Sequence, residues 1–487
     1  MLPESLSTTP EKPRTNETVL SSTEVQGHFE QLKAAYQRET FPSYETRRNL
    51  LDRLLTTCLQ RRDDIAAAAS KDWGHRCQVD TLLGDVFPTL NSIRYARSHL
   101  RSWMRPERRS TGLVFLPGQN RVRYQPLGVV GIIAPWNYPF QLCVEPLVYA
   151  IAAGNRVMVK PSEITPHTAA LLSDLLGEAL GPEWVRVVQG DASTAQAFTA
   201  LPFDHLLFTG SPRVGKLVMR AAAENLVPVT LELGGKSPAL VHPDYPLDKA
   251  AASIATGKCF NSGQTCVAPD YVLVQRDQLQ ALADAIAHCV RRRYPTITDN
   301  PDYSAIATDG HFTRLRHLLD DAAKAGATVV ELKADGEEPG QQRKIAPTLV
   351  TGVTPEMAIM QDEIFGPILP LVPYDSVEEA IAFINARPRP LAFYYFDHSG
   401  TRVDMVLKQT ISGSAAINEC LLQFAQDDIP FGGVGTSGMG AYHGQEGFAT
   451  FSHKRGVFHQ SRMNMMHLQE PPYGSRMERL LKFLLGA

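Results

Sequence analysis

Apolar and polar positions divide the chain into a helical stretch followed by two stretches that mix strands and helices. Between Glu24 and Trp103, apolar residues recur about every 3.6 positions, as from Leu50 to Leu59, with arginine and aspartate on the opposite side. This spacing predicts amphipathic helices, and Ser43 is a residue type that begins a helix. The stretch carries no obvious chemistry and predicts a helical layer over a sheet.

After residue 128, short apolar runs alternate with helical stretches. Helices are predicted over 141–153 and 165–180, and strands over 129–134, 156–160, 184–188, 205–208 and 227–231. This alternation predicts a doubly wound parallel sheet. A second α/β pattern continues to about residue 415, with strands over 271–274, 327–332 and 367–372. A Gly-rich break near Gly235 and a return near Ile417 mark the expected domain boundaries.

Two segments outside these patterns have the character of strands at a surface. Residues 113–126 predict two short strands around a Gly-Gln-Asn turn, and a strand within 445–460 could pair with them. The exposed edges of such a hairpin could pair with a partner, but an ordinary surface hairpin explains the first segment equally well. The expected division is therefore a first domain of 23–112 and 127–234, a second of 235–417, a return over 418–444, and this hairpin with its strand.

The two ends of the chain differ from the rest. Residues 1–22 are rich in Ser, Thr, Pro and Glu and predict a disordered lead-in. The tail, 461–487, contains a basic amphipathic helix from Arg476 to Leu485 that is too short to span a membrane. Docking on this protein or on a partner subunit is the preferred interpretation, and weak contact with a membrane surface is the alternative.

Composition removes several classes of function. The 487 residues are 44% hydrophobic and carry a formal net charge of -3, which does not favour nucleic acid as a partner. Seven cysteines, widely spaced and without a CxxC pair, argue against a disulfide scaffold and against a metal site, and they fit a reducing cytoplasm. The sequence has no apolar run of 18 residues, so we expect no transmembrane helix.

Polar motifs follow three of the predicted strands, where ligands of parallel sheets bind. They are Pro135-Trp-Asn137, Lys160-Pro-Ser-Glu163 and Thr209-Gly-Ser211. The loop from Gly210 to Gly215 precedes a helix, so its backbone amides could attract a phosphate, although an ordinary strand-to-helix turn has the same sequence character. Glu163 could accept hydrogen bonds from a ribose, or it could simply cap a helix.

Residues 257–268 are the principal candidate for covalent chemistry. Cys266 follows Asn261, Gly263 and Gln264. Attack on a carbonyl requires a partly exposed thiolate near groups that favour its charge, and a glycine turn brings backbone N–H groups close to a developing oxyanion. The alternative is an inert, buried cysteine.

Seven stretches, in order, resemble the signature motifs of the NAD(P)-dependent aldehyde dehydrogenase superfamily. They are Pro135–Pro139, Lys160–Glu163, Phe208–Ser211, Glu232–Lys236, Phe260–Cys266, Glu363–Pro367 and Pro430–Gly433. The resemblance extends from the first helices to Arg455. Residues 263–271 and 438–444 are similar to the class 3 branch, and 72–76, 386–395 and 426–430 resemble bacterial coniferyl aldehyde dehydrogenases.

The resemblance implies an α/β, aldehyde dehydrogenase-like fold: a Rossmann-like NAD-binding domain, an α/β catalytic domain and a small β oligomerisation segment. It implies that Cys266 attacks the aldehyde, that the Asn137 amide and the Cys266 N–H hold the oxyanion, and that Glu232 activates water. Relatives that transfer the acyl group to coenzyme A generally lack this glutamate, so a free acid is the expected product.

The resemblance also implies a binding site for NAD, with NADP as the alternative. It assigns Lys160 and Glu163 to the adenosine ribose, Glu363 to the nicotinamide ribose and Phe365 to the nicotinamide ring. Trp136 would contact the cofactor through its backbone. The loop containing Gly210, Ser211 and Gly215 would bind the pyrophosphate.

The substrate is less constrained than the chemistry. The candidates for an aromatic or apolar tunnel wall, each of which could equally be core, are Tyr138, Thr265, Leu421, Leu422, Phe424 and His443. No arginine stands near the motifs to bind a substrate carboxylate. A hydroxycinnamaldehyde such as coniferyl aldehyde is the first expectation, and a medium-chain aliphatic aldehyde is the second. A catalytically silent binding protein is the alternative of another class, and a homodimer is expected from the resemblance.

Overall fold

The computed structural model describes residues 20–464 and 470–486. Most of the predicted disordered lead-in lies outside this part of the chain. Its last residues belong to a helix, because Ser21 caps α1 (Ser22–Arg38) and Glu24 donates its N–H to the Ser21 hydroxyl. Ser21 and Ser22, which the predicted lead-in includes, therefore belong to the cap and the first turn of α1.

The predicted helical layer is present. Its remaining members are α2 (Tyr44–Gln60), α3 (Arg62–Trp73), α4 (Gln78–Thr81) and α5 (Phe87–Trp103). Ser43 is the N-cap of α2, as expected, and its hydroxyl accepts the Thr46 N–H at 3.0 Å. The leucine stripe of α2 is buried, and α2 packs against α5 and α7 (Pro166–Leu180).

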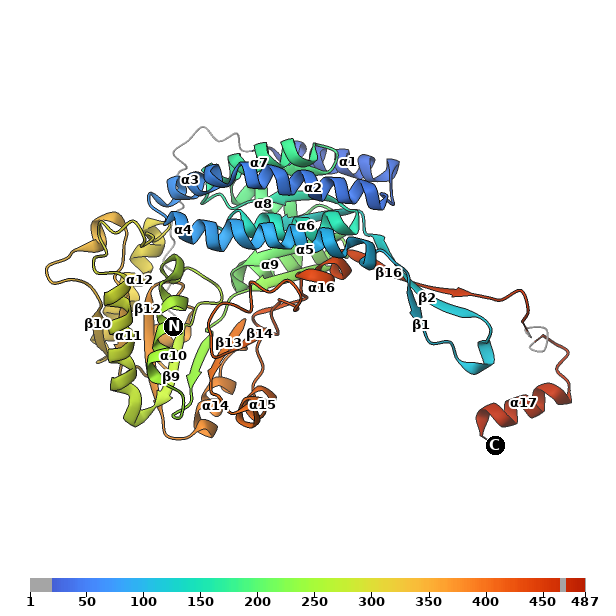
Figure 1. Cartoon of the computed structure of the whole chain (residues 1–487). Helices are drawn as coiled ribbons and strands as arrows, with labels where there is room; N and C mark the ends of the chain where they lie inside the picture. Colours follow the sequence, from blue (N-terminus) through green and yellow to red (C-terminus); the bar gives the residue numbers. More distant parts are fainter. Residues whose placement is uncertain (1–19, 465–469, 487) are drawn as a thin grey trace, which may run out of the picture.

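The first α/β unit contains a six-stranded sheet. In spatial order its strands are β15 (Gly438–Met439), β7 (Val229–Leu233), β6 (His205–Gly210), β3 (Val129–Ile133), β4 (Arg156–Lys160) and β5 (Val185–Val187). All neighbours are parallel except β15 and β7. The other helices of this unit are α6 (Gln141–Ala153), α8 (Ala192–Thr199) and α9 (Pro212–Ala223). Figure 1 shows the sheet beneath α2 and α7.

The second unit contains a seven-stranded sheet. Its order is β10 (Thr328–Glu331), β11 (Thr348–Thr351), β12 (Ile368–Tyr374), β9 (Tyr271–Gln275), β8 (Pro238–Val241), β13 (Ala392–Phe396) and β14 (Ser414–Ile417). Only β10 is antiparallel to its neighbour. Its helices are α10 (Leu247–Cys259), α11 (Leu279–Arg293), α12 (Asp309–Lys324), α13 (Ala358–Gln361), α14 (Val377–Asn385) and α15 (Gly400–Gln409). The largest buried apolar cluster includes residues of both units, and the domain limits stay a prediction.

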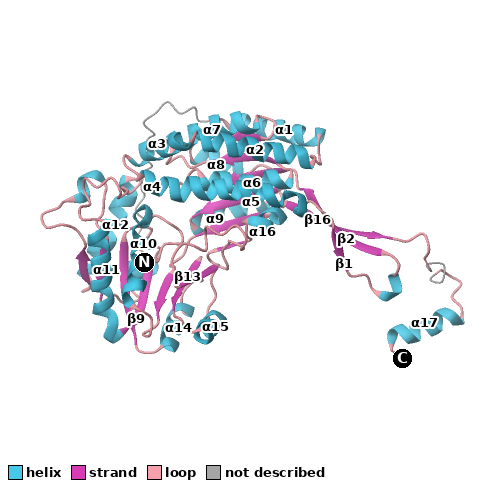
Figure 2. Ribbon diagram, viewed as in Figure 1, coloured by secondary structure: helices cyan, strands magenta, loops and turns pink. Residues whose placement is uncertain are grey.

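A three-stranded antiparallel sheet projects from these two units (Figure 2). Its strands are β1 (Glu107–Arg109), β2 (Gln119–Pro126) and β16 (Ser452–His459). The prediction of a first strand starting at Leu113 is wrong, because Leu113–Phe115 form a 3₁₀ turn and Leu113 is 86% exposed. The pairing partner predicted near the C-terminus is β16, which follows α16 (Gly444–Thr450).

The predicted tail helix is α17 (Ser475–Leu485). None of its residues is buried, and its exposed apolar side chains are Leu481, Phe483, Leu484 and Leu485. In Figure 1 it lies beyond the projecting sheet rather than on either α/β unit. In the described residues, no helix has the length and apolar character that crossing a bilayer requires.

Candidate active site

Strand register gathers the polar motifs at one edge of the six-stranded sheet. Ile133 at the end of β3 is level with Lys160 on β4 and with Phe208 on β6. Thr209 in turn is level with Glu232 on β7. Because these strands are parallel, the segments that follow them leave the sheet on the same side, where ligands of such sheets bind.

The loop before Cys266 has an unusual backbone. Asn261 and Ser262 adopt φ values of +49° and +51°, and Gly263 adopts +72°. A Cβ atom on Gly263 would lie 2.3 Å from the Gly366 carbonyl oxygen. Glycine is therefore required at 263 both by its φ and by the close approach of the segment after Glu363.

Hydrogen bonds hold this loop from several directions. The Asn261 side chain donates to the Asn137 carbonyl at 3.2 Å, which joins the loop to the first unit. Gln264 donates to the Ala305 carbonyl at 3.0 Å. The Asn261 N–H donates to Asp80 at 3.1 Å. Asp80 could not be recognised from the sequence, because nothing in the short helix α4 distinguishes it from a surface carboxylate.

Cys266 is partly buried and lies where two cavities meet. The larger cavity, of about 720 Å³, runs between the helical layer and α10. The smaller, of about 240 Å³, lies at the edge of the six-stranded sheet. Three residues line both cavities: Leu142, Cys266 and Phe424.

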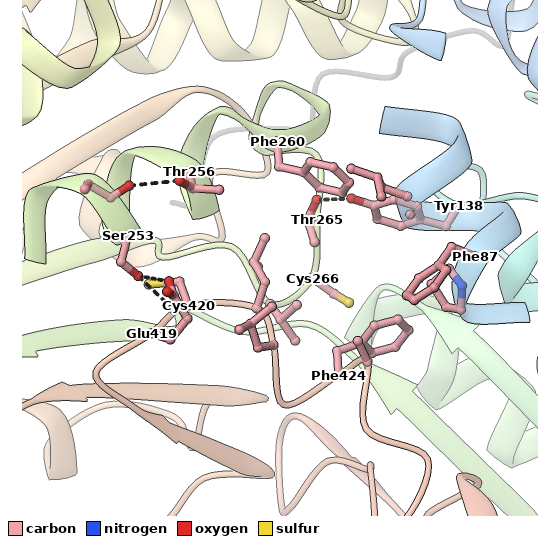
Figure 3. A pocket seen from close by; sticks show the side chains of 18 of the residues that line it. Phe87, Tyr138, Ser253, Thr256, Phe260, Thr265, Cys266, Glu419, Cys420 and Phe424 are labelled. Carbon is pink, nitrogen blue, oxygen red and sulfur yellow. Dashed lines mark hydrogen bonds between the residues drawn. The ribbon is translucent and has the colours of Figure 1, made fainter. Parts of the chain in front are cut away.

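Five of the six predicted substrate residues line the larger cavity: Tyr138, Thr265, Leu421, Leu422 and Phe424. Figure 3 shows the Cys266 side chain pointing into the space between Tyr138 and Phe424. The Tyr138 hydroxyl is 2.6 Å from the Thr265 hydroxyl, so the two side chains are hydrogen-bonded to each other.

His443 is the sixth, and it does not line this cavity. It is buried behind Phe424, with ring centroids 5.3 Å apart, and stacks on Phe431. Its Nε2 lies 3.2 Å from the Glu145 carboxylate. The sequence could not distinguish a wall residue from one that packs behind the wall.

The cavity also has walls that the sequence analysis did not assign. Phe87, Tyr245 and Phe260 add aromatic rings, and Phe260 stacks with Tyr138 at 6.4 Å. The expectation of no nearby arginine is wrong, because Arg293 at the end of α11 lines the cavity. Since Arg293 is 27 positions from Cys266, only the packing of α11 on α10 brings it there.

The smaller cavity contains most of the residues expected to bind a cofactor. Its lining includes Trp136, Gly210, Ser211, Glu363 and Phe365, together with Asn137 and Glu232. Lys160, Glu163 and Gly215 are outside this lining. The Lys160 amine lies 3.3 Å from the Glu163 carboxylate, and Gly215 is in α9, where a Cβ would lie 2.8 Å from Leu233.

The small cavity has the features that a dinucleotide requires. Ser211 caps α9, whose N-terminal amides and dipole favour a phosphate. Gly234 allows the Glu363 carboxylate to approach, since a Cβ there would lie 2.0 Å from Glu363 Oε2. Trp136 and Phe365 meet edge to face at 5.4 Å and provide an aromatic wall. These residues fit a nicotinamide dinucleotide.

Burial controls the protonation of the site. It raises the pKa of Glu363 to about 8 and holds the pKa of Glu232 well above its usual range. Both Glu232 oxygens lack a hydrogen-bond partner within the described chain. A raised pKa favours the protonated carboxyl at rest and makes the carboxylate, once ionised, a stronger base toward a proton of a ligand.

The same environment acts on the nucleophile. Burial, together with the charges of Glu363 and Glu232, raises the pKa of the Cys266 thiol to about 12. This differs from the expectation that the surroundings favour the thiolate; only the backbone N–H groups of Cys266 and Val267 do so. The resting thiol is therefore neutral.

Alkylation of Cys266 by iodoacetamide in the cofactor-free protein should accelerate about tenfold per pH unit from about pH 6 to pH 9, because the thiolate is the reactive form and its pKa lies above this range. Mass spectrometry of the peptide containing Cys266 measures the rate. A plateau below pH 8 would contradict the raised pKa.

In the part of the chain that the structure describes, no cluster of His, Cys, Asp and Glu could hold a metal ion. The groups that the site does bring together are the Cys266 thiol, the buried Glu232 carboxyl and the adjoining smaller cavity.

Comparison with known proteins identifies this arrangement. The sequence profile of the aldehyde dehydrogenase family matches residues 11–457. A Pseudomonas aeruginosa protein described as a probable coniferyl aldehyde dehydrogenase is 49% identical over 453 residues, which cover 93% of this chain and 94% of that protein.

Solved structures agree with this match. The substrate-bound Staphylococcus aureus AldH has a TM-score of 0.89 and 39% identity, over 94% of this chain and 99% of its own. The NAD⁺ complex of a Bacillus cereus aldehyde dehydrogenase has a TM-score of 0.82 and 26% identity, over 91% and 89%. This chain belongs to the aldehyde dehydrogenase family, and it is an NAD(P)-dependent oxidoreductase of aldehydes.

Proposed function

We propose that the chain oxidises a hydroxycinnamaldehyde, with coniferyl aldehyde as the first candidate, to the carboxylic acid. The observation that carries this proposal is the larger cavity at Cys266, whose walls include the aromatic rings of Tyr138, Phe260 and Phe424. Such walls suit a planar aromatic tail. The similarity to a relative described as acting on coniferyl aldehyde supports the same substrate.

The reaction begins at Cys266. Cys266 first loses its thiol proton to solvent, and the sulfur then forms a bond to the aldehyde carbon while the carbonyl π electrons move to the oxygen, which becomes an oxyanion. The Asn137 side-chain amide and the Cys266 N–H donate to that oxyanion. A nicotinamide cofactor in the smaller cavity supplies the acceptor for the hydride that leaves this carbon. The position of Cys266 in both cavities supports this division of roles.

Glu232 completes the cycle. The thioester left on Cys266 requires an attacking water, and Glu232 takes a proton from that water as a general base. The water oxygen bonds to the acyl carbon, the carbon–sulfur bond breaks, and the acid leaves. The two unpartnered oxygens of Glu232 support this role, because no donor among the described residues occupies the oxygens that would bind the water.

The cofactor is NAD rather than NADP in this proposal. Glu163, beside Lys160, would accept hydrogen bonds from the adenosine ribose and repel a 2′-phosphate. Gly210, Ser211 and the start of α9 would hold the pyrophosphate. We further propose a cytoplasmic homodimer that associates through the projecting sheet, whose outer strand β16 exposes Phe458. For the tail helix α17, docking on a partner subunit is the preferred proposal and weak contact with a membrane surface is the alternative, and its exposed apolar side chains support either one.

A medium-chain aliphatic aldehyde is the second candidate. Leucine side chains also line the larger cavity, at Leu83, Leu142, Leu421 and Leu422. An alkyl chain would bury against them without needing a ring.

A substrate panel tests the proposal. Formation of NADH or NADPH is followed with coniferyl aldehyde, benzaldehyde, hexanal and succinic semialdehyde. We expect the largest kcat/KM with coniferyl aldehyde and NAD. A strong preference for hexanal would favour the second candidate. If no aldehyde is oxidised although NAD binds, the chain is a silent relative.

A further inference from the structure

One side of the larger cavity is polar. Lys249, Ser253 and Thr256 lie on the same face of α10, at a spacing of four and then three residues. Arg293 from α11 and Glu419, which follows β14, also line this side. In Figure 3, Ser253, Thr256 and Glu419 are across the cavity from Phe87 and Tyr138, with Cys266 between the two groups.

The Glu419 carboxylate is held in a defined orientation. The Ser253 hydroxyl donates to Glu419 Oε1, and the Cys420 N–H donates to the same oxygen at 3.0 Å. The Cys420 N–H also lies 2.9 Å from the Ser253 hydroxyl. Among the residues that the structure describes, no hydrogen bond reaches Oε2. The half-buried carboxylate therefore has an acceptor available to a ligand.

The neighbouring hydroxyl differs in this respect. Thr256 already donates to the Ala252 carbonyl at 2.8 Å and accepts from Arg293 at 2.9 Å. Arg293 also donates to the Ala252 carbonyl at 3.0 Å. The hydrogen bonds of Thr256 and Arg293 thus go to each other and to the Ala252 carbonyl. Glu419 is therefore the acceptor on this side that is both held in place and available to a ligand.

We propose that Glu419 accepts a hydrogen bond from the ring hydroxyl of a phenolic aldehyde whose carbonyl is at Cys266. Ser253 is the positioning residue that orients the carboxylate. The inference rests on the proposed function and makes Glu419 the residue that distinguishes phenolic from plain aromatic aldehydes. A hydrogen bond to the oriented Glu419 side chain favours a substrate with the ring hydroxyl, because a substrate without this donor leaves the acceptor unpaired.

The test compares 4-hydroxycinnamaldehyde with cinnamaldehyde and with 4-methoxycinnamaldehyde, which has a substituent but no donor. We expect wild-type kcat/KM to be about tenfold higher for the hydroxyl substrate than for the other two. In Glu419→Gln this ratio should fall to near one, while kcat/KM for cinnamaldehyde is retained. The glutamine amide oxygen can still accept from Ser253 and Cys420, so the loop keeps its shape.

The matched control is Asp404→Asn, which removes one negative charge from the exposed pair with Lys408 on α15. It should keep the wild-type ratio. An unchanged ratio in Glu419→Gln, or an equal loss with all three aldehydes, would overturn the inference and leave the proposed function intact. Oxidation of hexanal with no turnover of the three aromatic aldehydes would overturn both.

Discussion

Replacing Cys266 with alanine is expected to lower aldehyde oxidation by at least about 10³-fold, because Cys266 is the thiol that faces both cavities, whereas Cys420 lines the larger one alone. Cys266 is the residue of the described chain that lines both cavities and carries a nucleophile. Removing its sulfur leaves the cofactor cavity otherwise unchanged. NAD binding, followed by fluorescence titration, should therefore survive in the variant that no longer forms NADH.

Cys259→Ala is the matched control for that experiment. Cys259 is buried at the end of α10, and burial raises the pKa of its thiol to about 12. It lines neither cavity around Cys266. We expect Cys259→Ala to keep most of its activity. The assignment of the nucleophile would be wrong if Cys266→Ala retained a tenth of wild-type turnover, or if the two variants were equally impaired.

Glu232→Gln is expected to trap the enzyme as an acyl thioester. The first turnover should still form NADH, because Glu232 acts on the attacking water in the later step. Steady-state turnover should fall by about 10²- to 10⁴-fold, the usual contribution of a general base. Rapid mixing measures the burst of NADH, and intact-protein mass spectrometry detects the acyl group on Cys266.

A second carboxyl in the same cavity provides the contrast. Glu363 lines the cavity beside Glu232 but is proposed to hold the nicotinamide ribose. Glu363→Gln should raise the KM for NAD without accumulating thioester. A Glu232→Gln enzyme that shows neither a burst nor an acyl adduct would place the defect before hydrolysis and contradict the assigned role.

The parallel sheets could be predicted from the sequence because their strands are buried on both faces and form continuous apolar runs. The strand predicted over 156–160 is β4 with the same bounds. The projecting sheet lacks this signal. Its first strand, Glu107-Arg-Arg109, is charged and mainly exposed, whereas the apolar segment nearby is a turn. The apolar run at 113–116 thus identified the wrong segment for the first strand of this sheet.

The site shows a similar division. Family membership and the cofactor were predicted from ordered motifs, and the comparisons confirm both. Residues that reach the cavity through tertiary packing, such as Arg293 and Glu419, had no local signal. His443 belongs to a family-like motif but packs behind the cavity wall, stacked on Phe431 and beside the buried Glu145 carboxylate. Motifs report chemistry, and packing decides which side chains face a ligand.

Because the two cavities share a wall, we expect substrate choice and cofactor affinity to be coupled. Leu142 and Phe424 line both cavities, so replacing either side chain should change the binding of the aldehyde and the binding of NAD together. Thermodynamic linkage makes such coupling reciprocal. If an aldehyde that moves the Phe424 ring changes the affinity for NAD by some factor, NAD changes the affinity for that aldehyde by the same factor. A substitution at Phe424 that enlarges the larger cavity for a bulkier aldehyde would therefore also change the affinity for NAD. Substitutions at Leu83 or Phe87, which line the larger cavity alone, would leave the affinity for NAD unchanged.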